Sequence, residues 1–297
     1  MEKIIECVPN FSIGKNEAAA EQIISAIKSV SADVRVLDHS YDPDHGRLVV
    51  TYIGDGDTLR DATYQGVKKA VEIVNLNYHE GVHPYIGAVD VIPLIPLRKA
   101  TFNDCIKIRN ELSKKISDEL AIPVFIYGSI AKKPERNELS SIRKGGIEGV
   151  SGRMATPEGR PDFGPARLHP TAGAVAIGAR EILIAFNVNL DSRDIEAAKG
   201  IAAKIRAKNS ALRGVKAIGV ELSSRGMVQV AVNIMHYKSA SIKQVFDAIK
   251  KETAEREIPI HSSEIIGLIP KDASFEGMKE YLKLDNWDGS RILENFL

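Results

Sequence analysis

The sequence predicts an α+β protein made of two ferredoxin-like (βαββαβ) subdomains, each a sheet with helices on one face. The length of 297 residues suits two domains of about 150 residues each. Short or alternating apolar runs predict strands, and apolar positions at helical spacing predict helices between them. Because the order β-α-β-β-α-β occurs once in each half, we divide the chain into residues 1–180 and 181–297.

The first half shows this order of elements and then continues with a further helix and strand. Its first helix places Ala20 and three isoleucines on one face, which is typical of an amphipathic helix on a sheet. The expected strands are residues 3–9, 34–38, 48–53, 89–97 and 124–127, and the expected helices are residues 17–30, 57–74 and 103–120.

The second half begins near Glu181 and repeats the order. Asp191 and Ser192 supply an N-cap for its first helix, which we expect to run to about Lys208. The turn of residues 223–226 joins two strands as a hairpin. The expected strands are residues 182–190, 215–222, 227–235 and 258–269, and the later helices are residues 241–256 and 274–284.

Between the halves lies an irregular stretch, roughly residues 131–179, which is rich in glycine, proline and arginine. A structureless run of this length in a compact chain is usually functional or mobile. A plain linker is polar and featureless, whereas this stretch interleaves Phe163, Leu168 and Val175 with arginines. We therefore expect a functional segment here, with a flexible interdomain linker as the alternative.

The composition is that of an ordinary soluble globule, with 44% hydrophobic and 27% charged residues. A formal net charge of +1 gives no global attraction for nucleic acid or an anionic membrane, so we expect neither as a partner. No apolar run approaches the roughly 20 residues of a membrane span, and no signal-peptide pattern follows Met1, so we expect a cytoplasmic protein. Cys7 and Cys105 are expected to be buried, reduced thiols.

The segment from His79 to His83 reads HEGVH and matches the H-E-x-x-H pattern of zinc hydrolases. That pattern needs a helix with both histidines on one face. Gly81 weakens a helix interior by about 1 kcal/mol, and Pro84 pushes His83 towards extended geometry. The segment therefore predicts a turn that enters a strand, and we expect no metal. A zinc hydrolase that uses His79, Glu80 and His83 remains a remote alternative, and a polar loop with incidental histidines is another.

Three segments, in this order and spacing, resemble the formiminotransferase domain family, the glutamate formimidoyltransferases. They are residues 7–12 (CVPNFS), residues 83–90 (HPYIGAVD), and residues 161–165 (PDFGP) followed by 173–174 (GA) and 178–180 (GAR). Residues 185–190 and 266–270 also resemble the family, so the resemblance covers nearly the whole chain. In animals this domain is fused to a cyclodeaminase. Here the chain ends at Leu297, and we expect a separate cyclodeaminase to act next in the pathway.

The resemblance implies transfer of the formimidoyl group from N-formimidoyl-L-glutamate to N5 of tetrahydrofolate, which gives 5-formimidoyltetrahydrofolate and L-glutamate in histidine degradation. It implies tetrahydrofolate as co-substrate, a homodimer, and two subdomains with facing sheets, helices outside and folate between them. The alternative within the family is formyl transfer between glutamate and 5-formyltetrahydrofolate. A non-enzymatic folate- or amino-acid-binding module with the same fold is a further possibility.

The resemblance also assigns general acid–base catalysis to His83. The chemistry agrees, because attack by N5 requires a proton shuttle and the unperturbed pKa of histidine is about 6.5. Asp90 or Glu80 could orient the His83 ring, while His79 lines the pocket. Folate binding is assigned to Gly164, Pro165, Ala166, Arg167, Leu168, His169, Pro170, Thr171, Ala172 and Gly173.

Arginines are the expected partners of the ligands' carboxylates, because their forked donors match a carboxylate bidentately. Arg47, Arg160 and Arg167 are the candidates. Two residues near these segments depart from the family pattern: Tyr85 stands where the animal domains have arginine, and Ala172 stands where they have tryptophan. A third departure is Ile13, at a position that is often glutamate. These three positions bear on how the pterin and the glutamate are held.

Overall fold

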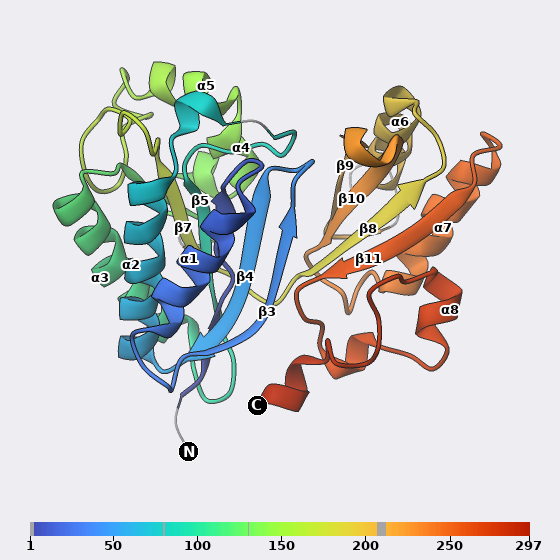
Figure 1. Cartoon of the computed structure of the whole chain (residues 1–297), viewed down its shortest axis with the longest axis horizontal. Coiled ribbons are helices and arrows are strands. Elements are labelled where there is room, and N and C mark those ends of the chain that lie inside the picture. The colour runs from blue at the N-terminus through green and yellow to red at the C-terminus, as the bar shows by residue number, and fades with distance from the viewer. Residues whose placement is uncertain (1–2, 80, 130, 207–211) are drawn as a thin grey trace. The chain divides into compact units, whose positions relative to one another are not determined.

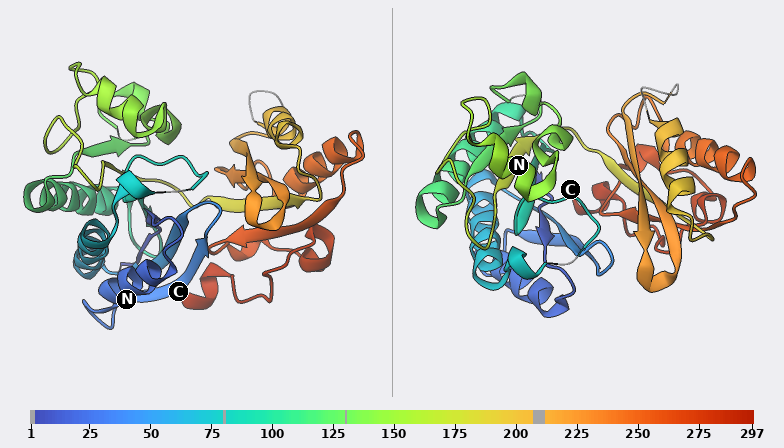
Figure 2. Two further views of the ribbon diagram at one scale, coloured as in Figure 1. Left: turned by 45° about the horizontal axis from the view of Figure 1, so that its top comes forward. Right: turned by 90° about the horizontal axis from the view of Figure 1, so that it is seen from above.

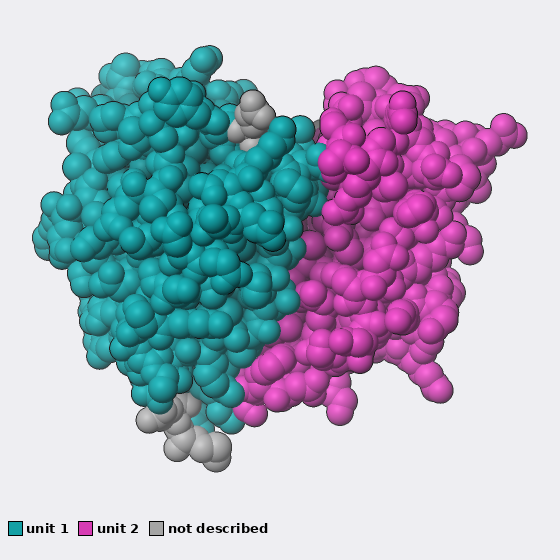
Figure 3. Space-filling view, in the orientation of Figure 1, with its two compact units in different colours: residues 1–181 teal, residues 182–297 magenta. Residues whose placement is uncertain are grey.

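The computed structural model describes residues 3–79, 81–129, 131–206 and 212–297 (Figure 1). The chain divides into unit 1, Met1–Glu181, and unit 2, Ile182–Leu297, which are coloured separately in Figure 3. Each unit has its own sheet and its own buried core. The expected α+β class is therefore confirmed. Within the described residues, no helix combines the length and the apolar character needed to traverse a bilayer.

Unit 1 is built on a seven-stranded sheet in the order β1-β4-β2-β5-β7-β6, with β3 beside β4. The expected single strand over residues 3–9 is wrong: it is interrupted at Val8 and Pro9 and resumes as β2, because proline has no N–H to donate to a ladder. Strands β5 and β6 each pair in parallel with β7, and the other pairings are antiparallel. The strands are β1 (Ile5–Cys7), β2 (Asn10–Ser12), β3 (Arg35–Asp42), β4 (Arg47–Gly54), β5 (Val89–Pro96), β6 (Val124–Tyr127) and β7 (Val175–Ala179).

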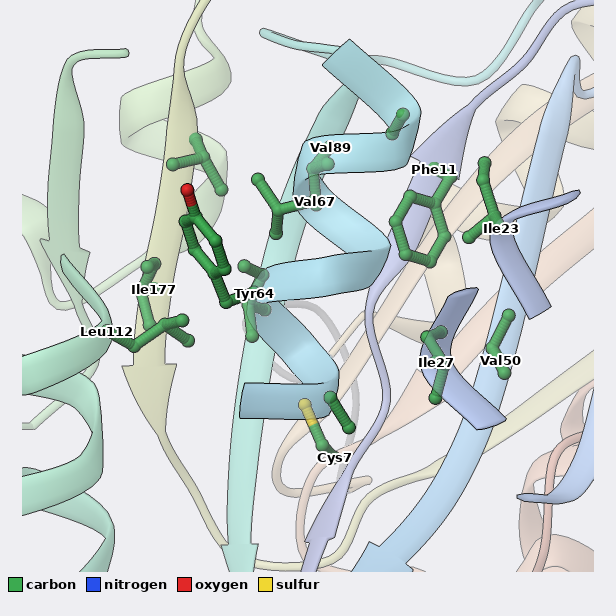
Figure 4. Close-up of a cluster of buried hydrophobic side chains, with 14 of the residues drawn as sticks. Cys7, Phe11, Ile23, Ile27, Val50, Tyr64, Val67, Val89, Leu112 and Ile177 are labelled. Carbon is green, nitrogen blue, oxygen red and sulfur yellow. The ribbon is translucent and has the colours of Figure 1, made fainter. Parts of the chain in front are cut away.

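Three helices cover one face of this sheet close to the predicted positions: α1 (Glu17–Lys28), α2 (Gly56–Ile73) and α3 (Phe102–Leu120). Side-chain caps fix where they begin: Asp55 accepts from the first N–H groups of α2, and Thr101 forms a capping box with Asp104 on α3. Figure 4 shows the core around α2, with Phe11, Ile23 and Ile27 on one side and Leu112 and Ile177 on the other. Both cysteines are buried, unpaired thiols, as expected, and burial raises the pKa of each to about 12.

The stretch over residues 131–179 is more ordered than the sequence predicts, since it contains α4 (Leu139–Arg143), α5 (Gly146–Arg153) and β7. Ile142, Val150 and Met154 from this stretch form a second core with Phe125 and Tyr127 of β6. Figure 2 (left) shows α3 and the light-green α4–α5 pair on opposite sides of β6. The prediction that helices lie on one face only is therefore wrong for unit 1. Both helices are short and α5 contains glycines, so neither carries a long helical period.

Unit 2 has the expected order β-α-β-β-α-β, arranged as an antiparallel sheet in the order β11-β8-β10-β9. The cap of its first helix differs from the prediction: Asp194, not Asp191 or Ser192, accepts from the N–H groups of Glu196 and Ala197. The helix ends at Ile205, and the expected end at Lys208 lies outside the described residues. The elements are β8 (Ile184–Leu190), α6 (Ile195–Ile205), β9 (Val215–Leu222), β10 (Met227–Ile234), α7 (Ile242–Ala254), β11 (Ile260–Ile266) and α8 (Met278–Leu282).

Glu6 of β1 is a buried carboxyl group whose effect on stability depends on pH. Burial raises its pKa from 4.5 to about 7, although the nearby Arg180 opposes the shift. The folded chain therefore binds this proton more tightly than the unfolded chain, and stability is lost as pH rises from about 4.5 to about 7. Glu6→Gln should remove this loss and raise the free energy of unfolding above pH 7 by up to about 3 kcal/mol.

Denaturant unfolding of wild type and Glu6→Gln at about pH 5 and about pH 8 checks this result. The exposed Glu21→Gln is the matched control and should leave the pH dependence of wild type intact. Equal stability of wild type and Glu6→Gln at both pH values would show that Glu6 is ionised in the folded protein.

Candidate active site

The site starts at the tight turn between β3 and β4. Oδ1 of Asp42 accepts hydrogen bonds from the backbone N–H groups of Asp44 (2.9 Å) and His45 (3.0 Å). Oδ2 of Asp42 lies 3.2 Å from Nδ1 of His45, whose side chain is 3% exposed. Gly46 then takes a φ of 64°, which favours glycine, and the chain enters β4 at Arg47. The turn therefore fixes where the Arg47 side chain starts.

The loop that carries His83 lies against this turn. Val82 N donates to Asp44 O at 3.1 Å, and His83 N donates to His45 O at 3.4 Å. Gly81 lies so close that a Cβ there would approach His45 O to 2.6 Å. In the described residues 79 and 81–88 no helix is present, so the zinc-hydrolase alternative loses the helix it requires.

His83 is partly buried and is held by a guanidinium. Nη1 of Arg47 lies 2.8 Å from Nε2 of His83 and donates to Oδ1 of Asn10 at 3.3 Å. Because a guanidinium can only donate, we assign Nε2 of His83 as an acceptor and place the ring proton on Nδ1. Burial, then the charges of Arg47 and Arg143, hold the pKa of His83 well below its usual value. The neutral imidazole is the form that a general base requires.

Asp90, at the start of β5, accepts a hydrogen bond from the backbone of the loop that carries His83. Its side chain is buried, and Oδ1 accepts from Ile86 N at 3.0 Å and from Nε of Arg143 at 3.3 Å. Its Oδ2 forms an ion pair with Nη2 of Arg143 on α4. Asp90 therefore contacts the loop backbone and Arg143, and these bonds fix the backbone at Ile86 and offset part of the Arg143 charge.

The predicted folate segment, residues 164–173, forms a closed loop before β7. His169 and Gly173 exchange two backbone hydrogen bonds, of 2.9 and 3.1 Å. Nδ1 of His169 accepts from Ala172 N at 3.0 Å and from Thr171 N at 3.3 Å, and burial lowers the pKa of this ring. The hydrogen bonds give the small residues of this loop one defined backbone path.

This loop lies side by side with the His83 loop. Ala88 N donates to Ala172 O, and Ala174 N donates to Ile86 O, both at 2.9 Å. Between these bonds, Gly87 and Gly173 face each other in an antiparallel bridge. A Cβ on Gly87 would lie 1.7 Å from Ala174 O, so only glycine allows this approach. The structure therefore brings the His83 loop and the predicted folate segment together.

The remaining predicted residues take different positions. His79 packs edge-on against Tyr85 with ring centroids 4.4 Å apart, and burial lowers the pKa of His79. Tyr85, one of the departures from the family pattern, thus has a partner in the loop itself. Arg160 and Arg167 have exposed side chains, whereas Arg47 contacts His83. Glu80 lies outside the described residues.

Sequence reasoning missed three residues of the site: Asn10, His45 and Arg143. Asn10 sits within the CVPNFS motif, which was the available signal. His45 follows Asp42 by three residues in a turn, a spacing that indicates an Asp–His pair only once the turn is known. Arg143 belongs to α4, a helix that the sequence did not predict.

A histidine of lowered pKa beside an arginine and a glycine-lined loop is an arrangement suited to proton transfer on a small, anionic substrate. Residues 4–180 match the formiminotransferase domain, N-terminal subdomain, and residues 185–291 match the formiminotransferase domain. The chain belongs to the formiminotransferase family.

Full-length relatives agree with this assignment. The chain is 39% identical, over 100% of its length and 99% of the relative's, to glutamate formimidoyltransferase of Streptococcus pyogenes serotype M1. It is also 39% identical to glutamate formimidoyltransferase of Thermoplasma acidophilum, covering 98% of this chain and 96% of the relative. Formimidoyltransferase-cyclodeaminase of Dictyostelium discoideum is 32% identical over 96% of this chain, which spans 54% of that protein.

Proposed function

We propose that this chain transfers the formimidoyl group from N-formimidoyl-L-glutamate to N5 of tetrahydrofolate, giving 5-formimidoyltetrahydrofolate and L-glutamate, as a step of histidine degradation. The observation that carries the proposal is the imidazole of His83, whose pKa is lowered, on a loop that is hydrogen-bonded to the glycine-lined segment of residues 164–173. Two relatives that match nearly the whole chain, both named glutamate formimidoyltransferase, support the same reaction. Tetrahydrofolate serves as co-substrate.

In the proposed reaction, N5 attacks the amidine carbon of the donor, and the bond from that carbon to the glutamate nitrogen then breaks. His83 takes the proton from N5 through Nε2 and returns it to the departing nitrogen. In the structure Nε2 accepts from Arg47. A carboxylate of the donor offers Arg47 a bidentate partner, and moving the guanidinium onto it frees Nε2 for the proton. Arg47 thus links donor binding to the availability of the base.

The folate segment contributes small residues and a cation to the proposed site. Glycine at positions 164 and 173 permits close backbone approach to a flat ring, and both residues have positive φ. Ala172 of this loop is buried, while Arg167 is exposed and free to reach a ligand carboxylate. We therefore assign the pterin to the loop backbone and a glutamate carboxylate of folate to Arg167.

Arg167→Ala should weaken tetrahydrofolate binding by roughly 1–3 kcal/mol, because a hydrogen bond between charged groups is lost. The loss should be smaller at high salt if the contact is exposed. Titration of the protein with tetrahydrofolate at two salt concentrations measures both effects. Lys68→Ala, which removes an exposed cation from α2, is the control and should bind like wild type. Equal affinities of wild type and Arg167→Ala would remove Arg167 from the site.

The reaction itself is tested by incubating the protein with tetrahydrofolate and either formiminoglutamate or formylglutamate and following the folate product spectrally. Turnover with formiminoglutamate supports the proposal, and turnover with formylglutamate alone would select the formyl-transfer alternative. Binding of both substrates without turnover would identify a binding module instead.

Catalysis without a metal is part of the proposal, since the histidine loop is not the helix of a zinc motif. Within the described part of the chain, no three His, Cys, Asp or Glu side chains are grouped to hold a metal ion. Activity should therefore survive dialysis against a chelator. Activity that is lost on dialysis and restored by zinc would overturn this element.

Two further elements of the proposal concern partners and location. The relative from Dictyostelium discoideum is named as a fusion with a cyclodeaminase, which supports a cyclodeaminase as the next enzyme after this one. A homodimer and a cytoplasmic location remain predictions from the sequence. Light scattering of the purified protein tests the first, and cell fractionation tests the second.

A further inference from the structure

A cavity in unit 1 lies between α3 and the segment that precedes the folate loop. Its volume is about 390 Å³. Arg109, Asn110, Glu111 and Lys114 of α3 line one side, Ile126 of β6 and Phe163 supply apolar surface, and Lys132 and Asp162 complete the wall. None of these residues belongs to the His83 site. The volume falls within the range of roughly 300–1,000 Å³ that is typical of small-molecule sites.

Arg109 is the unusual residue of this cavity. It is 7% exposed, and its Nε and Nη2 both donate to Oδ1 of its neighbour Asn110, at 3.2 and 2.8 Å. Its Nη1 is buried and has no hydrogen-bond partner among the described residues. A buried guanidinium nitrogen without an acceptor is costly, because it loses water and gains nothing in exchange. The burial also lowers the pKa of Arg109.

The charges around the cavity leave a positive excess. Arg136 is 5% exposed and forms an ion pair with Asp162, whose side chain is 7% exposed. The same carboxylate accepts from Ile126 N at 2.8 Å, and its field is the one that opposes the lowered pKa of Arg109. Two buried guanidinium groups therefore share one buried carboxylate. Glu111, the other acid of the wall, is paired with Arg60 at 2.8 Å.

The hydroxyl group of Ser113 is a second buried donor without a hydrogen-bond partner among the described residues. Ser113 lies one helical turn after Arg109 on α3, so the two side chains share a helix face. Its Oγ is fully buried and, like Nη1 of Arg109, has no hydrogen-bond partner among the described residues. Only Arg109 of the two lines the cavity, so its Nη1 is the donor available to an oxygen of an anion there.

We propose that this cavity binds a small organic anion, with its carboxylate or phosphate group on Nη1 of Arg109 and its apolar body against Ile126 and Phe163. The anion supplies the missing negative charge and the missing acceptor. Lys132 is exposed at the wall and adds attraction for the approaching anion. The site is independent of the proposed transfer reaction, because it shares no residue with the His83 site.

Calorimetric titration of the full chain with phenyl phosphate and with benzoate tests the proposal. Both probes should bind saturably with one molecule per chain, and the neutral benzyl alcohol should not. Arg109→Gln should weaken binding of phenyl phosphate at least about tenfold, as expected for the loss of a charged hydrogen bond. Lys28→Gln removes an exposed cation from α1, away from the cavity lining, and should leave the affinity unchanged.

No saturable binding of either probe, or equal affinity in wild type and Arg109→Gln, would overturn the proposal. If Arg109→Gln does not fold, Lys132→Gln, which removes an exposed cation of the cavity lining, serves in its place and should weaken phenyl phosphate binding several-fold. Formimidoyl transfer by the Arg109 variant at saturating substrates should match wild type. A wild-type protein that binds phenyl phosphate but does not catalyse formimidoyl transfer would contradict the proposed function and leave the proposal of an anion site intact.

Discussion

Replacing His83 with alanine is expected to lower kcat for formimidoyl transfer by about 100-fold or more, because the proton on N5 then has no positioned acceptor. Folate binding should be largely kept, since the segment of residues 164–173 holds its conformation through its own backbone hydrogen bonds. Steady-state kinetics and a folate titration measure the two quantities separately. His261→Ala, at an exposed position of β11, is the control and should behave like wild type.

The pH dependence of kcat/KM gives a second view of the same residue. The pKa of His83 lies well below 6.5, so the base is already deprotonated at neutral pH and the acidic limb of the profile should fall below pH 6.5. Arg47→Gln removes the second-largest cause of the shift and should move this limb upward. His83 would be excluded as the base if His83→Ala kept a near-normal kcat. The same conclusion would follow if the acidic limb of the kcat/KM profile stayed at the same pH in Arg47→Gln.

Gly87→Ala is expected to destabilise unit 1 by about 3 kcal/mol and to abolish folate binding. The added Cβ would lie 1.7 Å from Ala174 O and 3.0 Å from Ala172 O, so the backbone of one loop has to move away from the other. That movement breaks the bonds from Ala88 to Ala172 and from Ala174 to Ile86. Thermal unfolding and a folate titration of the variant check the result.

Gly152→Ala is the matched control for this prediction. Gly152 lies in α5 with open space around its Cα, and alanine in a helix is favoured over glycine. This variant should be as stable as wild type or slightly more stable. Wild-type stability together with wild-type folate affinity in Gly87→Ala would show that the two loops do not depend on their close approach.

Hydrophobic periodicity predicted most of the elements because their burial is regular. The apolar stripe of α1 and the apolar runs of β4 and β5 are examples, and each lies within a few residues of its predicted place. Strand β7 was missed for a physical reason. All of its residues are buried and none is polar, so it shows no alternation of apolar and polar residues, and its parallel partners are remote in the sequence.

The site could be predicted only in part. The HPYIGAVD segment led to His83 through the family resemblance, and Arg47 was named as a carboxylate ligand. Its contact with His83 depends on the turn of residues 42–46 meeting the loop of residues 79–88, which is a tertiary contact without a local signal. The partner of Asp90 was likewise hidden, because Arg143 lies in the stretch that shows no clear period.

Strand β7 has a consequence for how the protein is made. It fills the position between β5 and β6, which do not pair with each other in the described sheet. As the chain leaves the ribosome, β5 and β6 emerge first, and each has an unpaired edge until β7 follows. Parallel pairing across such a sequence distance forms slowly. The predicted folate loop immediately precedes β7, so the two loops of the candidate site come together in the same late step that joins β6 to the sheet.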